Sequence, residues 1–151
     1  MFRSCIFSNL TNNSKWDIKK FHIEASSIDS VTNVHNRKYM ISHIRKMITL
    51  SKKENNNITF LMIGIDHFKA VIDEFDYDVG DLVLVELAKV IHSKIKEYDI
   101  VARLTGDEFL VALVNLPSTT TAQTIAQKII EKFAKVRVIV NEDTGQALQK
   151  T

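Results

Sequence analysis

Three acidic side chains are the residues of this sequence whose types and spacing could do chemistry together. Asp66 directly follows an apolar run, and Asp107 and Glu108 lie in a short segment between two further apolar runs. Carboxylates that converge on one point can hold a divalent cation, but Asp and Gly are also common in solvated turns. Taken alone, the acidic pair therefore favours a solvated hairpin tip, and only its surroundings can favour a site.

The apolar runs around these acids predict the strands that position them. Residues 58–65 are nearly continuously apolar, which is typical of a strand covered on both faces. Residues 100–104 and 109–115 are shorter β-type runs, and the segment 105–108 between them predicts a tight hairpin because it contains Gly106 and Asp107. We expect the first strand at the centre of the sheet.

The segments before, between and after these strands include runs with apolar residues at helical spacing. Amphipathic helices are predicted over about residues 36–53 and 79–97, with a polar turn region before the second. A third helix is predicted after Pro117, capped by Ser118 or Thr119, and residues 136–140 predict a last strand.

The resulting order is βαββαβ, an α+β fold of the ferredoxin-like type with an antiparallel sheet and helices on one or both faces. In that plan the first and third strands are antiparallel neighbours. The end of the first strand, at Asp66, is therefore expected beside Asp107 and Glu108, so two acidic segments meet at one edge.

Composition places the chain among ordinary globular proteins. It has 151 residues, 45% of them apolar and 25% charged, with a net charge of +2 and one cysteine. We expect no nucleic-acid partner, no disulfide, no transmembrane segment and a cytoplasmic setting. Residues 1–10 are interpreted as a loose leader and residues 16–28 as a lead-in helix, so residues 1–27 precede a domain expected over 28–151.

Several ordered motifs resemble those of the GGDEF family of diguanylate cyclases. Residues 65–69 read IDHFK, residues 80–81 read GD before a leucine-rich stretch, and residues 102–109 read ARLTGDEF. Residues 29–38, DSVTNVHNRK, resemble the opening DxLTGLxNR segment of that family. The resemblance covers about residues 29–133, and several motifs in order are far more specific than one short motif.

The resemblance implies a nucleotidyl-cyclase palm in which two Mg²⁺ or Mn²⁺ ions bind the triphosphate of GTP. Two such domains then meet and condense two GTP molecules to cyclic di-GMP. The metal ligands that it implies here are Asp107, the Ile65 backbone and, as a substitute ligand, Asp66. The implied catalytic residues are Glu108 and Lys69. The implied nucleotide contacts are Asp81, Thr105 and Gly106.

The departures from the family pattern concern the metal and the base. Gly64 stands where the family has its first metal-binding acid, and Ile72 stands where an asparagine reads guanine. Thr105 replaces the first glycine of the signature, and residues 96–99 read KEYD in place of the inhibitory RxxD motif. Residues 136–140 supply at most the first of the family's last elements. These changes predict weak metal binding, poor guanine selectivity and no product feedback.

Three functions are consistent with these observations. The first choice is a degenerate, C-terminally shortened GGDEF domain that is catalytically inactive and acts by weak nucleotide binding or by contact with a second copy, another GGDEF protein or another signalling protein. The alternative is an active diguanylate cyclase. A ferredoxin-like RNA-binding module ranks last, because Phe60 and Phe109 are too few for a stacking surface.

Overall fold

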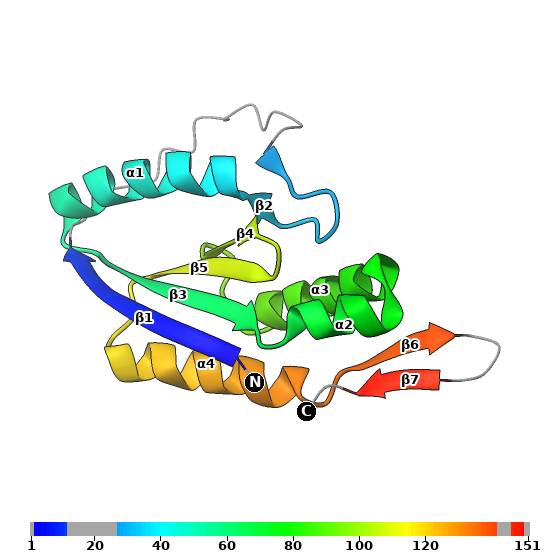
Figure 1. Ribbon diagram of the computed structural model, residues 1–151. Helices are drawn as coiled ribbons and strands as arrows, with labels where there is room; N and C mark the ends of the chain where they lie inside the picture. The colour runs from blue at the N-terminus through cyan, green and yellow to red at the C-terminus, as the bar shows by residue number, and fades with distance from the viewer. Residues whose placement is uncertain (1, 12–26, 142–145, 150–151) are drawn as a thin grey trace.

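A five-stranded sheet carries helices on both of its faces (Figure 1), in a computed structural model that describes residues 2–11, 27–141 and 146–149. The strand order is β1-β3-β5-β4-β2. From one edge to the other, the strands are β1 (Phe2–Thr11), β3 (Asn57–Ile65), β5 (Glu108–Val114), β4 (Ile100–Thr105) and β2 (His35–Asn36).

The strand β3 is apolar along its length because both of its faces are covered. Leu61 and Ile63 pack in the larger core with α3 (Tyr77–His92) and α4 (Thr119–Phe133), whereas Ile58 packs in a smaller core on the other face. The antiparallel pairing of β3 with β5 runs from Ile58 opposite Val114 to Ile63 opposite Phe109. The predicted central strand and its antiparallel neighbour are thus confirmed.

The helices that cover the two faces begin at residues that cap them. α1 (Arg37–Glu54) covers the face opposite α3 and α4 (Figure 1), and its Met47 belongs to the smaller core. Asn36 Oδ1 accepts the Tyr39 N–H at 3.0 Å, and Ser118 Oγ accepts the Thr121 N–H at 3.3 Å. The expectation that Ser118 or Thr119 caps the third helix is confirmed for Ser118.

Two expectations about the middle of the chain were wrong. The segment expected to be a polar turn region contains a helix, α2 (Phe68–Phe75), whose Phe68, Val71 and Phe75 pack on the main core. The helix expected over residues 79–97 is α3, which ends at His92. A turn follows, in which the Asp99 carboxylate accepts the Lys96 N–H at 2.8 Å.

The two ends of the chain also differ from expectation. Residues 1–10 were expected to be a loose leader, but β1 is an edge strand antiparallel to β3. The last predicted strand exists as β6 (Arg137–Asn141), yet it pairs with β7 (Gln146–Gln149) in a separate two-stranded sheet. The place beside β3 that a βαββαβ plan gives to its last strand is therefore taken by β1.

The predicted lead-in helix falls mostly on residues 12–26, which lie outside the described residues. Among the helices that the structure describes, none combines the length and the low charge of a membrane-spanning segment.

Candidate functional site

A two-residue turn at the tip of β4 and β5 forms one side of the candidate site. β4 ends at Thr105 and β5 begins at Glu108, so Gly106 and Asp107 make the turn. Gly106 has φ 39°, in the left-handed region that glycine enters without a steric penalty. The predicted hairpin is confirmed, and its residue types fit its backbone.

The carboxylate of Asp107 joins this turn to the end of β3. Its Oδ2 accepts the backbone N–H of Ile65 at 3.1 Å, across a wide separation in sequence. A Cβ atom built on the neighbouring Gly64 would lie 4.0 Å from the same oxygen. The end of β3 and the acidic turn therefore meet as the strand order predicts, and position 64 borders the Asp107 carboxylate. We call this meeting point of Gly64, Ile65 and Asp107 the corner.

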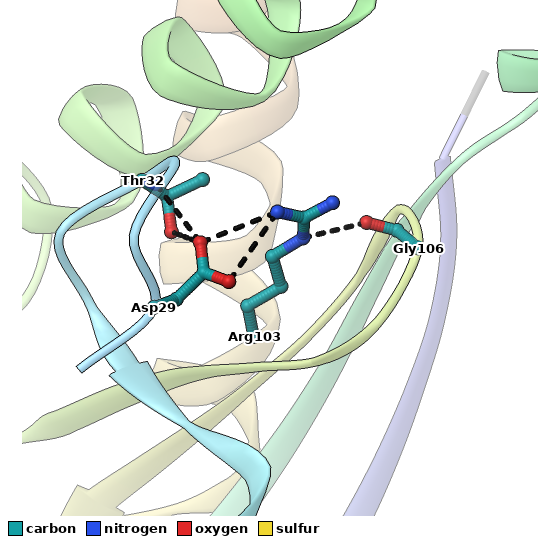
Figure 2. A network of polar contacts seen from close by, with 4 residues as sticks. All are labelled: Asp29, Thr32, Arg103 and Gly106. Atoms are coloured by element: carbon teal, nitrogen blue, oxygen red, sulfur yellow. Dashed lines mark hydrogen bonds and ion pairs between the residues drawn. The ribbon is translucent and has the colours of Figure 1, made fainter. Parts of the chain in front are cut away.

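An ion pair and several hydrogen bonds attach the hairpin to the loop before β2 (Figure 2). Arg103 Nε donates to the Gly106 carbonyl at 2.7 Å, and Arg103 Nη1 lies 3.2 Å and 3.4 Å from the two Asp29 oxygens. Asp29 Oδ2 also accepts the Thr32 N–H at 2.9 Å and the Thr32 hydroxyl at 2.7 Å. Arg103 therefore bridges the turn that carries Asp107 and the opening motif of the domain.

The surroundings of Asp29 favour its charged form. Burial of the carboxylate opposes ionisation, but the two hydrogen bonds from Thr32 and the charge of Arg103 together outweigh it and lower the pKa of Asp29 below its usual value of 3.8. The geometry shows that one guanidinium group holds the turn and stabilises a partly buried acid.

The remaining residues of the predicted site lie on the hairpin, just beyond β3, on α2 and on α3. Glu108 is exposed and its Oε2 accepts the Thr105 hydroxyl at 3.1 Å, while Asp66 is half-buried just beyond β3. Lys69 is exposed on α2 and Asp81 is half-buried on α3. The structure brings Gly64, Ile65 and Asp107 together, but within the described residues it forms no hydrogen bond from Lys69 or Asp81 to the Asp107 carboxylate.

Ile72, which the resemblance places where an asparagine is expected, lies in the contact between two helices. A Cβ atom built on Gly80 of α3 would lie 3.1 Å from Ile72 Cγ1 and 3.2 Å from Phe68 Cζ of α2. Gly80 therefore lets α2 and α3 approach closely. Ile72, which is half-buried, contributes to that packing and has no group with which to read a base.

The donor set at the corner does not fit a pair of divalent metal ions. Gly64 supplies no carboxylate, and Asp107 Oδ2 already accepts the Ile65 N–H. Within the part of the chain that the structure describes, no three His, Cys, Asp or Glu side chains are grouped so that they could hold a metal. A site for two metal ions needs several carboxylate oxygens around the two ions.

Comparison with known proteins agrees with the motifs at this corner. Residues 26–149 match the family described as "Diguanylate cyclase, GGDEF domain". The chain belongs to the GGDEF family. Its Asp107-Glu108-Phe109 segment is the acidic part of the motif from which the family takes its name, and Thr105 stands in place of the first glycine of that motif.

Curated relatives of this GGDEF chain are considerably longer proteins. The signaling protein YkoW of Bacillus subtilis is 34% identical over 108 residues, which are 71% of this chain and 14% of YkoW. Diguanylate cyclase TpbB of Pseudomonas aeruginosa is 36% identical over 102 residues, which are 68% of this chain and 23% of TpbB. The chain thus corresponds to a small part of each relative.

Solved structures of GGDEF domains share the fold. The isolated GGDEF domain of TpbB from Pseudomonas aeruginosa has a TM-score of 0.69 at 32% identity, covering 81% of this chain and 69% of that one. Diguanylate cyclase SiaD from the same species, solved with its activator SiaC, has a TM-score of 0.70 at 29% identity, covering 83% of this chain and 47% of SiaD. The predicted α+β palm is confirmed.

Proposed function

We propose that this chain is a GGDEF domain of cyclic di-GMP signalling that does not condense GTP to cyclic di-GMP. The observation that carries the proposal is the pair formed by Gly64 and Asp107. Position 64 borders the Asp107 carboxylate closely enough for an acid there to share a metal with it, yet it has no side chain. Of the two metal-binding acids that the family resemblance implies, at position 64 and at Asp107, only Asp107 is present, and one such ligand is too few for the two-metal clamp that GTP condensation uses in this family.

The proposed role is to bind a partner, with nucleotide binding that is weak. A signalling domain that no longer turns over its substrate can still stabilise one conformation of a partner, provided that it binds that conformation more tightly. SiaD, which shares this fold, is solved in complex with an activator protein. We propose a second GGDEF domain or another signalling protein as the partner, and the cytoplasm, where a lone cysteine stays reduced, as the setting.

The test is to incubate the purified chain with GTP and Mg²⁺, and separately with Mn²⁺, and to look for cyclic di-GMP by mass spectrometry. Asp107→Ala is the matched control, because it removes the carboxylate that the corner retains. We expect no product from either protein. Product from the wild-type chain that disappears in Asp107→Ala would overturn the proposal and establish the active cyclase instead.

A further inference from the structure

A buried carboxylate without a hydrogen-bond partner lies at the C-terminal end of α1. Glu54 is the last residue of this helix and is only 2% exposed. Its Oε1 atom accepts no hydrogen bond from the part of the chain that the structure describes. Buried carboxylates are normally paired with a cation or bound to a metal, because removing an unpaired charge from water is costly. Glu54 therefore requires a partner other than the described side chains.

Glu54 lines a small cavity between the end of α1 and the sheet. The volume of this cavity is about 10 Å³, which is about the space that one water molecule needs. Apolar residues form one side of it, namely Met47, Ile58 and Val114, and polar residues form the other, namely Ser51, Glu54 and Asn56. The Ser51 hydroxyl donates its hydrogen to the Ile48 carbonyl at 3.2 Å, so its oxygen is left as an acceptor.

A second oxygen without a partner lies in the same segment, residues 51–57, which we call the α1–β3 junction. Asn57 is the first residue of β3. Its amide nitrogen donates to the Leu116 carbonyl at 2.7 Å, and this bond fixes the amide so that the buried Oδ1 is the atom without a partner. Glu54 Oε1, Asn57 Oδ1 and Ser51 Oγ are thus three acceptors, and metal cations such as Na⁺ bind to oxygen atoms of this kind.

The end of α1 adds a negative potential at the same place. The last turn of a helix leaves backbone carbonyls without intrahelical partners and carries a partial negative charge, which repels a carboxylate and attracts a cation. Lys52 and Lys53 also belong to this turn, but both are exposed, so water and salt screen their charges. A water molecule in the cavity supplies hydrogen bonds without charge, whereas a metal ion supplies the charge that Glu54 requires.

We propose that Glu54 binds a monovalent metal cation, Na⁺ or K⁺, at the C-terminal end of α1, with neutral oxygen atoms of the α1–β3 junction completing its coordination. One carboxylate balances one positive charge. Among the described residues, no three His, Cys, Asp or Glu side chains form the kind of group that divalent and transition metals prefer. Asn57 begins β3 and Ile65 ends it, so this site and the corner lie at opposite ends of one strand.

Thermal melting of the whole chain in NaCl, KCl and choline chloride at equal ionic strength tests the proposal. We expect the wild-type Tm to be at least about 3 °C higher in NaCl or KCl than in choline chloride, because an ion that binds only the folded chain stabilises it. The salt that gives the higher Tm identifies the ion. Glu54→Gln keeps the shape of the side chain without its charge, and its Tm should agree within about 1 °C in all three salts.

Glu74→Gln, which removes an exposed acid of α2, is the matched control and should respond to the three salts like wild type. If Glu54→Gln does not fold, Ser51→Ala removes a neutral oxygen from the same cavity and should reduce the difference in Tm between the salts by about half or more. Equal wild-type Tm values in the three salts, or a difference that persists unchanged in these cavity variants, would overturn the inference. Neither result concerns cyclic di-GMP, so the proposed function is tested separately.

Discussion

Asp29 and Arg103 form a contact that attaches the acidic hairpin to the loop before β2. Their side chains are 20% and 15% exposed, so the ion pair is partly shielded from water, and Thr32 supplies two further hydrogen bonds. Partly buried, hydrogen-bonded pairs contribute more to stability than exposed pairs do. Asp107 therefore owes its position to residues that need not touch a ligand.

The substitution Asp29→Asn tests this role because it removes the charge while keeping the shape of the side chain. We expect the free energy of unfolding to fall by about 1–2 kcal/mol, since Arg103 loses a charged partner in a partly buried place. Urea denaturation measures the change. Asp73→Asn, on the exposed face of α2, is the control and should stay within about 0.5 kcal/mol of wild type. Equal effects of the two substitutions would contradict the structural role.

At the scale of elements, α2 and α3 approach each other closely at Gly80. A Cβ atom at this position would lie 3.1 Å from Ile72 Cγ1 and 3.2 Å from Phe68 Cζ, which is closer than Cβ atoms normally lie to their neighbours. A larger residue must push the two helices apart or displace the Ile72 side chain. Lys69 on α2 and Asp81 on α3 would move with their helices.

Gly80→Val should therefore destabilise the domain by about 2 kcal/mol or more through overpacking. The double variant Gly80→Val with Ile72→Ala should recover part of that loss, because the second change opens space at the contact. Thermal and urea unfolding of the single and double variants measure the coupling. A double variant whose loss is the sum of the two single losses would show that the residues do not compete for space.

Apolar runs and apolar periodicity predict those elements whose own sequence contains such a pattern. The central strand, the hairpin, α1 and α4 are confirmed because each has a continuous or periodic apolar pattern. The helix α2 was missed although Phe68, Val71 and Phe75 fall at helical spacing, since the segment is only eight residues long. The strand β1 was missed because its pairing with β3 is long-range and leaves no local pattern.

The same limit applies to the candidate site. Antiparallel pairing of the first and third strands is enough to predict that Asp107 meets the end of β3, and the structure confirms it. The link between Asp29 and Arg103 was not predictable, because the two residues come from distant segments whose spacing in sequence carries no signal.

At the scale of the whole molecule, we expect two histidines, His35 and His43, to make stability depend on pH. His35, Tyr39 and His43 stack, with ring centroids 3.8 Å and 5.2 Å apart along the series. Burial lowers the pKa of His35 below 6.5, assisted by the charge of His92. Burial also lowers the pKa of His43, assisted by the charges of His35 and Lys46. Both rings are therefore more readily protonated in the unfolded chain.

The sign of the pH effect follows from these lowered pKa values. Between each lowered pKa and 6.5 the unfolded chain binds more protons, so the free energy of unfolding rises with pH through that window. We expect the urea midpoint to be highest above pH 6.5 and to fall as the pH is lowered to about 5. His35→Gln with His43→Gln should give a flatter profile, and an equally steep profile in that variant would show that other groups are responsible.

The central claim is that the missing carboxylate at position 64 is what disables the metal site. Gly64 has room for a side chain, since the nearest atom to a Cβ there is Asp107 Oδ2 at 4.0 Å. The decisive measurement is calorimetric titration of GTP with and without Mg²⁺ into wild type, Gly64→Asp and the uncharged control Gly64→Asn.

We predict that Mg²⁺ raises the GTP affinity of Gly64→Asp by about tenfold or more, because the charge of the ligands sets the affinity of a divalent-cation site. The gain should be absent in wild type and in Gly64→Asn, and it should disappear when Asp107→Ala is added to Gly64→Asp. A Gly64→Asp protein whose GTP binding does not respond to Mg²⁺ would contradict the claim.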